Sequence, residues 1–208
     1  MKHLIEALEG VFVAAAKSGG DLARTADLAL NNVNWSGELN NHYPESNSVV
    51  DAHLETACAS SGQDGSASHR VAGELLAATK QLKWRTSSRG RADDPVLSAF
   101  SRNYTAMTIL GNGGLLPSDK ITAGFNLLGP DVFYPPHAHT AEESYWNIGG
   151  RGEWKVDDTP WFTVELGDSI YHKSGALHAM RTNDLPLLSV WLWTSHLDSE
   201  VVIVRGAL

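Results

Sequence analysis

The chain has 208 residues, of which 42% are hydrophobic and 19% are charged, and its formal net charge is -8 at pH 7. A chain of this length can bury one good core with a substantial appendage, and its composition is that of an ordinary soluble globular protein. The acidic balance argues against nucleic acid and an anionic membrane as partners, because both select clustered Lys and Arg.

The N-terminal segment does not have the pattern of a signal peptide. Glu6 and Glu9 would interrupt its apolar core, and no stretch of the chain reads convincingly as a membrane span. Cys58 is the single cysteine, so it cannot form an internal disulfide, which is compatible with a reducing compartment. We therefore expect a cytoplasmic protein.

Residues 1–104 show the spacing of helices. Apolar residues recur every three or four positions within residues 4–15, 21–30 and 71–82. Asp94 followed by Pro95 predicts the capped start of a short helix that continues to Phe100. Polar, glycine-containing stretches predict loops at residues 31–48 and 60–66. We expect this helical N-terminal region to pack on the remainder of the chain.

Residues 105–208 change to short runs of strand-forming residues separated by turn residues. Short strands at this spacing favour a sandwich or barrel. The predicted fold is therefore mostly β in its C-terminal part and α+β overall. The predicted strands cover residues 105–110, 122–128, 144–148, 152–156, 162–166, 169–172, 177–181, 187–193 and 201–204.

Residues with metal-binding donors lie close together in this second part. His137 and His139 are two positions apart, so on a strand their imidazoles would leave the same face. Glu143 follows four residues later, and a tight turn would bring its carboxylate beside them. A third imidazole is available in residues 167–183, where His178 follows Gly175. Three imidazoles and a carboxylate suit Fe(II), Mn(II), Ni(II), Co(II) or Zn(II), and residue types do not select among these metals.

These two segments resemble the motifs of the cupin family. The first motif, G-x5-H-x-H-x3-E-x6-G, is matched at His137, His139, Glu143 and Gly150. The second, G-x5-P-x-G-x2-H-x3-N, is matched at Gly167, Gly175 and His178. The resemblance implies a cupin jelly-roll β-barrel with one divalent metal ion bound by His137, His139, Glu143 and His178.

The departures from the cupin motifs leave the ligand positions intact. Gly129 lies two residues further from His137 than the first motif requires, Lys173 replaces the proline of the second, and Asn183 is one position late. They put the entry turn of the first motif in doubt.

Other polar residues near the two motifs are predicted to lie outside the site. Tyr171 beside His172, and the place of His172 ahead of Gly175, favour a strand-edge residue over a ligand. Glu142 would point away from Glu143 if both are extended, which indicates a solvated charge. The remaining histidines have no partner that the sequence can place and are expected at the surface: His3, His42, His53, His69 and His196.

Aromatic residues accompany the predicted ligands. Tyr145 lies two positions after Glu143 and would share its face, and Tyr134 immediately precedes the Pro135-Pro136 pair. A phenol has a pKa of about 10 in water, so it acts as a base at neutral pH only if a cation or hydrogen bonds favour the phenolate. For each tyrosine, and for most of the tryptophans in this part, a packed core residue is the competing interpretation.

Trp191 and Trp193 share one face of a predicted strand. Aromatic faces on the wall of a small cavity suit a compact organic cation, and each good contact contributes about 0.5–2 kcal/mol.

With these aromatics the chain is similar to the cupin-type dimethylsulfoniopropionate lyases, particularly the DddQ branch. The ligands and the two tyrosines carry the similarity in residues 105–208, and residues 1–104 share only its helical character. The resemblance implies β-elimination of a small zwitterionic sulfonium, dimethylsulfoniopropionate, to dimethyl sulfide and acrylate. It implies that the metal binds the substrate carboxylate and that Tyr145 removes the α-proton. Tyr134, Trp191 and Trp193 would contact the sulfonium, with Tyr134 alternatively a metal ligand.

Other cupin functions stay open at this point. An Fe(II) dioxygenase is one, and a sugar isomerase is another, although the latter is expected to carry more Arg and Lys in its pocket strands. A non-enzymatic ligand-binding cupin would usually carry a DNA-binding helix-turn-helix, and residues 1–104 contain no evident basic recognition helix. The chain is compatible with a monomer or a homodimer.

Overall fold

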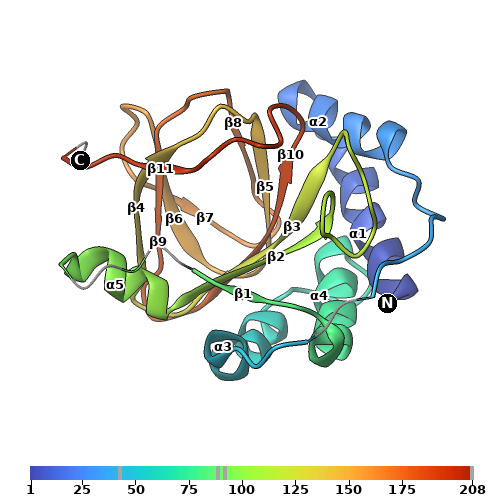
Figure 1. Ribbon diagram of the computed structural model, residues 1–208, viewed down its shortest axis with the longest axis horizontal. Helices are drawn as coiled ribbons and strands as arrows, with labels where there is room; N and C mark the ends of the chain where they lie inside the picture. Colours follow the sequence, from blue (N-terminus) through green and yellow to red (C-terminus); the bar gives the residue numbers. More distant parts are fainter. Residues whose placement is uncertain (42–43, 88–89, 91–92, 207–208) are drawn as a thin grey trace.

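The computed structural model describes residues 1–41, 44–87, 90 and 93–206. A layer of helices lies along one side of a β-barrel, and a further short helix lies across the barrel from α1 (Figure 1). The helices are α1 (Lys2–Ala15), α2 (Gly20–Asn32), α3 (Ser48–Ala59), α4 (Ala67–Ala78), the 3₁₀ turn η1 (Thr79–Gln81) and α5 (Pro95–Arg102).

Two antiparallel sheets form the barrel. The six-stranded sheet has the order β1 (Arg85–Thr86), β2 (Tyr104–Leu110), β3 (Thr122–Leu128), β10 (Leu187–Trp193), β5 (Glu143–Gly150) and β8 (Ser169–His172). The five-stranded sheet has the order β11 (Val202–Ile203), β4 (Phe133–Ala138), β9 (His178–Arg181), β6 (Gly152–Val156) and β7 (Phe162–Val164). This arrangement confirms the predicted fold, a jelly-roll barrel of the cupin type preceded by a helical region.

The six-stranded sheet is buried on both faces because its residues alternate between the helices and the barrel interior. On β5, Trp146 and Ile148 belong to the core shared with the helices, whereas Tyr145 belongs to the barrel core. Phe12 of α1 joins the two layers, since its ring lies 5.3 Å from that of Trp146 in an edge-on arrangement. The alternation leaves one complete set of side chains pointing into the barrel, where the site lies.

Several predicted elements are confirmed by the structure. The strands at 122–128, 152–156, 169–172 and 187–193 have the predicted bounds. Asp94 caps α5 by accepting a 3.0 Å hydrogen bond from the Leu97 amide, with Pro95 in the first turn. The side chain of a cap satisfies amides that the helix itself leaves unpaired.

The strand β4 was absent from the predicted list although it carries His137. Pro135 and Pro136 cannot donate to a ladder, so their presence argues against a regular strand. The pairing of β4 with β9 accommodates them because its register shifts between Tyr134 and His137. This irregularity brings two residues three positions apart to the same side of the sheet.

Two further elements were not predicted. The helix α3 begins where the Asn47 side chain accepts hydrogen bonds from the Val49 and Val50 amides. The short strand β1 pairs with β2, so part of the N-terminal segment contributes to the barrel sheet. Residues 1–104 thus contribute a strand to the barrel sheet as well as helices. The division into a domain of residues 1–104 and a domain of residues 105–208 stays a prediction.

The packing of α1 on the sheet gives a testable stability effect. We expect Phe12→Ala to lower the free energy of unfolding by about 3–5 kcal/mol, because a fully buried ring is lost and leaves a cavity. Val13→Ala on the same helix is the control, since Val13 is 45% exposed and should change stability by no more than about 0.5 kcal/mol. Urea denaturation measures both, and equal effects would show that α1 does not stabilise the barrel through this contact.

Candidate functional site

One carboxylate and two imidazoles meet inside the barrel. Nε2 of His139 lies 3.0 Å from Oε2 of Glu143, and Nε2 of His178 lies 3.4 Å from the same oxygen. All three side chains are buried, and their ligand atoms lie within 4.8 Å of one another. They come from the turn after β4, the first residue of β5 and the first residue of β9. This group could hold a metal ion.

The hydrogen bonds of the imidazoles orient them for such a role. Nδ1 of His137, His139 and His178 lies 2.8–3.0 Å from the backbone oxygens of Pro135, Ala141 and Ala176, respectively. A carbonyl oxygen can only accept, so each Nδ1 carries the proton and each Nε2 of the neutral ring presents a lone pair. A backbone carbonyl on the distal nitrogen is a common outer contact of metal-binding histidine.

The contact between Glu143 and these rings requires a positive charge. A neutral imidazole with its proton on Nδ1 offers Oε2 only a lone pair, so the 3.0 Å approach of His139 needs a proton or a cation between the two atoms. Nε2 of His178 is buried and has no hydrogen-bond partner among the described residues. The donor set and its geometry therefore fit a divalent transition metal.

The carboxylate is held in its charged form. Burial alone would raise the pKa of Glu143, but when a proton lies between the carboxylate and the imidazoles of His139, His172 and His178, these hydrogen bonds hold that pKa well below its usual range. A deprotonated carboxylate is the form that binds a metal ion. Trp193 contributes to this environment, because its Nε1–H donates a 2.7 Å hydrogen bond to Oε1 of Glu143.

His137 lies against this group. Its ring centroid is 4.0 Å from that of His178, with which it is paired in register across β4 and β9. Burial, and the neighbouring His178, lower the pKa of His137 well below its ordinary value, so the ring is neutral. The Tyr134 ring stacks on the His137 ring, with centroids 3.9 Å apart and an interplanar angle of 9°. The register shift in β4 makes this stacking possible.

His172 is more deeply involved than the sequence predicted. The strand β8 is at an edge of its sheet, but the His172 side chain is fully buried and its ring stacks on that of His178 at 4.0 Å. Its Nδ1 lies 3.5 Å from Oε2 of Glu143. Burial, and the neighbouring His178, lower its pKa to about 4. The predicted place on an edge strand is confirmed, but the burial of the side chain beside Glu143 was not predicted, because strand position does not tell which face of an edge strand is covered.

Glu142 also departs from its prediction as a solvated charge. Its carboxylate is paired with Arg24 of α2 at 2.9 Å and accepts a 2.6 Å hydrogen bond from the Tyr171 hydroxyl. His3 and His196 are exposed and His53 and His69 half-buried, whereas His42 lies outside the described residues. None of these four described histidines belongs to the group around Glu143.

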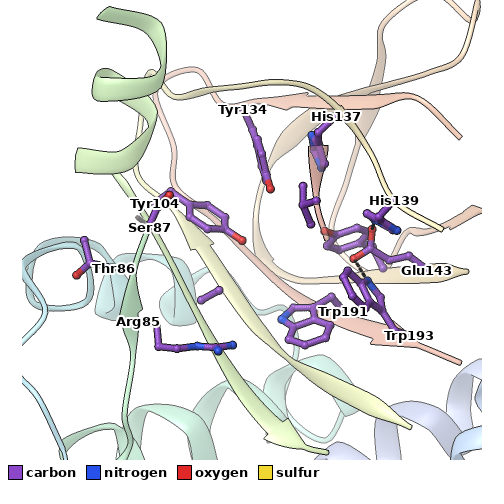
Figure 2. A pocket seen from close by; sticks show the side chains of 13 residues that line it. Arg85, Thr86, Ser87, Tyr104, Tyr134, His137, His139, Glu143, Trp191 and Trp193 are labelled. Atoms are coloured by element: carbon purple, nitrogen blue, oxygen red, sulfur yellow. Dashed lines mark hydrogen bonds and ion pairs between the residues drawn. The ribbon is translucent and has the colours of Figure 1, made fainter. Parts of the chain in front are cut away.

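A cavity of about 320 Å³ opens beside the imidazoles and Glu143. Figure 2 shows its lining, in which the hydroxyls of Tyr104 and Tyr134 point toward its middle. Each predicted contact residue lines this cavity, namely Tyr134, Tyr145, Trp191 and Trp193. Its volume is at the lower end of the range for small-molecule sites, about 300–1,000 Å³.

Tyr104 and Arg85 are among the lining residues that were not predicted. Tyr104 is the first residue of β2, and it lies on the same face as Ala106 because the two are two positions apart. This spacing was the signal that could have placed Tyr104 in the cavity. Arg85 of β1 reaches the cavity from the N-terminal segment, and its Nη2 donates a 2.7 Å hydrogen bond to Thr108. No sequence signal connects Arg85 with the site, because the pairing of β1 with β2 is a tertiary contact.

Tyr145 is buried beside Glu143. Burial and the negative charge of Glu143 raise its pKa well above its ordinary value. In these surroundings the phenol is protonated at neutral pH unless a cation lies close to it. Any role of Tyr145 as a base therefore depends on the charge that the neighbouring group holds.

The chain is similar to known proteins in both sequence and fold. Residues 23–189 match the family model described as dimethylsulfoniopropionate lyase. The chain is 30% identical over 129 residues to dimethylsulfoniopropionate lyase DddQ of Ruegeria pomeroyi, which covers 62% of this chain and 63% of that protein. It is 33% identical over 103 residues to a putative dimethylsulfoniopropionate lyase, DddL of Cereibacter sphaeroides, which covers 49% of this chain and 43% of that one. The matches thus span less than two thirds of these relatives.

Solved structures share the fold over nearly the whole chain. The crystal structure of DddQ from Ruegeria pomeroyi superposes with a TM-score of 0.65 at 25% identity, covering 93% of this chain and 96% of that one. A chain from the crystal structures of the dimethylsulfoniopropionate lyases RdDddP and RnDddQII gives a TM-score of 0.74 at 22% identity, covering 98% and 96%. In the part of the chain that the structure describes, the helices are too short or too polar to cross a bilayer.

The bond from Trp193 to Glu143 predicts an effect on metal binding. We expect Trp193→Phe to weaken binding of Zn²⁺ about tenfold or more, because outer contacts of metal ligands typically contribute 10–100-fold. Competition with a chromophoric chelator measures the affinity. Trp191→Phe is the matched control, since Trp191 lines the same cavity and should leave the affinity unchanged. If both variants bound Zn²⁺ as the parent does, the indole N–H would have no part in holding Glu143.

Proposed function

Because the chain belongs to the dimethylsulfoniopropionate lyase family, we propose that its barrel cavity cleaves dimethylsulfoniopropionate to dimethyl sulfide and acrylate by metal-dependent β-elimination. The observation that carries the proposal is the buried group of His139, Glu143 and His178 at the wall of an aromatic cavity. We include His137 as the fourth ligand, since its Nδ1 is bonded to a carbonyl and its ring lies against His178. The metal is one of Zn, Fe, Mn, Ni and Co.

A bound divalent ion would supply positive charge to the substrate carboxylate and to the negative charge that grows at the α-carbon as the proton leaves. The protein's own contribution at this end is a single buried carboxylate, Glu143, surrounded by imidazole rings. With one ligand charge against a divalent cation, the site keeps a net positive charge. That charge suits a substrate with a carboxylate.

The α-proton would be taken by Tyr145. The side chain lines the cavity and is buried beside Glu143, which gives it a fixed position at the reacting end. As the phenolate it accepts the proton, and the electron pair of the broken C–H bond forms the carbon–carbon double bond while the C–S bond breaks. Dimethyl sulfide leaves as a neutral molecule, so the leaving group needs no acid.

The sulfonium would lie against aromatic rings away from Glu143. Trp191 and Tyr134 line the cavity, and so does Tyr104, whose ring centroid lies 5.2 Å from that of Tyr134. Cation–π contacts hold a sulfonium without a formal counter-charge, at about 0.5–2 kcal/mol each. Trp193 has its N–H on Glu143, so its proposed contact with substrate would be through the ring. Tyr134 stacks on His137, which supports a role beside the ligands as well.

The first test is release of dimethyl sulfide into the headspace from purified protein given dimethylsulfoniopropionate. We expect release that disappears after chelation and returns when one of the candidate metals is restored. Acrylate should form in equal amount, because the elimination produces both. Metal content, measured on the same samples, establishes that the restored protein is fully loaded.

Absence of release from the fully loaded protein, with every candidate metal, would contradict the lyase assignment. Oxygen consumption would then favour a dioxygenase. A sugar isomerase is less suited to this cavity, because Arg85 is the only Arg or Lys in its described lining.

The role of Tyr145 predicts a separation of binding from turnover. We expect Tyr145→Phe to keep its metal and to lose about 10²–10⁴-fold in rate, which is the usual contribution of general-base catalysis. His178→Ala is the companion variant and should lose the metal itself. Metal content and the initial rate of dimethyl sulfide release distinguish the two. Elimination by Tyr145→Phe at the parental rate would remove Tyr145 from the mechanism.

Two expectations from the sequence stay proposals beside this one. They are a location in the cytoplasm and a monomeric or homodimeric state. Size-exclusion chromatography with light scattering would test the second.

A further inference from the structure

The two neighbours of Glu143 in the chain are both bonded to the helix α2. Nη2 of Arg24 lies 2.9 Å from Oε1 of Glu142, and its Nη1 lies 3.4 Å from Oε2. The hydroxyls of Thr25 and Ser144 form a 2.8 Å hydrogen bond, and both side chains are fully buried. Adjacent residues of one helix thus contact the residues on either side of the metal-binding carboxylate.

Further hydrogen bonds join Glu142 and Arg24 to neighbouring residues. Tyr171 of β8 donates a hydrogen bond to the same carboxylate, and burial together with the Glu142 charge raises the Tyr171 pKa to about 12, so the hydroxyl keeps its proton. The Glu142 amide donates to Ser195 Oγ at 3.0 Å. Arg24 also donates to the Tyr171 hydroxyl at 3.2 Å. The guanidinium, the phenol and the carboxylate form one connected network.

This network lies at the junction between a turn and the first residues of β5. Residues 139–142 form the turn between β4 and β5, outside the ladders of both strands. The carboxylate of Glu143 must nevertheless be held to within about 0.5 Å for a ligand set to be productive. An exposed ion pair contributes little to overall stability. The ion pair of Arg24 with Glu142 lies on the turn that carries His139 and leads to Glu143. It can therefore fix the position of these residues even if it adds little to overall stability.

We infer that Arg24 and Thr25 of α2 are positioning residues, which hold Glu142 at the end of the turn and Ser144 at the start of β5 so that Glu143 is presented to the metal. The inference rests on the metal site of the proposed function. It assigns the helical region a part in the chemistry of the barrel, and α2 becomes an outer support of a ligand that it does not touch.

The test uses the full-length protein and Zn²⁺ as the probe. We expect Arg24→Gln to weaken Zn²⁺ binding about tenfold, at the low end of the effect of outer contacts, because the neutral side chain cannot maintain the paired geometry. Arg24→Lys should recover part of the affinity, since it retains the charge. Asp21→Asn is the matched control, because it removes the other carboxylate partner of Arg24 and leaves Glu142 in place.

Two further readouts separate positioning from general stability. The visible spectrum of the Co²⁺-substituted protein reports the ligand geometry, and we expect it to change in Arg24→Gln and not in Asp21→Asn. Glu142→Gln should resemble Arg24→Gln, and the double variant should be no weaker in Zn²⁺ binding than the weaker single variant. Non-additivity of this kind is the mark of two residues that act through one contact.

The outcomes are distinguishable. Parental Zn²⁺ affinity and an unchanged Co²⁺ spectrum in Arg24→Gln, even with a lowered melting temperature, would overturn the positioning role and leave the metal site intact. Failure of the unaltered protein to bind either ion would overturn the metal site and the positioning role together.

Discussion

The structure depends on one buried carboxylate placed among imidazole lone pairs. Glu143 is 3% exposed, and three imidazole nitrogens lie 3.0–3.5 Å from its Oε2. Nδ1–H of His139 and of His178 donates a hydrogen bond to a backbone carbonyl, so the Nε2 lone pairs face the carboxylate. A cation among these atoms would compensate the buried negative charge. The barrel core, the stacked aromatic rings and the network on α2 all keep water out of this cluster or hold its parts in place.

Sequence reasoning predicted the parts of the site that depend on local spacing. His137 and His139 are two positions apart and Glu143 is near them along the chain, so a turn suffices to bring them together. His178 was placed by its likeness to a known motif rather than by spacing. Tyr145 followed from alternation with Glu143 on one strand, and it does line the cavity. Fold class followed equally well, because the short strands have clear periodicity and turns.

The rest could not be predicted because it arises from contacts between distant segments. Because Pro135 and Pro136 argue against a regular strand, β4 was not predicted. Its register shift places Tyr134 on the ring of His137. His172 and Trp193 contact Glu143 from strands that neighbour β5 on either side. Pairings of this kind are set by the order of strands in a sheet, which one sequence does not reveal. The contacts of α2 with Glu142 and Ser144 are of the same type.

The alternation of side chains on β10 limits which sequence changes can alter the cavity during evolution. Leu188, Val190 and Leu192 belong to the core under the helices, whereas Trp191 and Trp193 line the cavity. Because side chains alternate, inserting or deleting one residue here would exchange the two sets and ruin core and cavity at once. Evolution toward another substrate is thus confined on this wall to substitutions at the cavity-facing positions, while changes of length must fall in the loops.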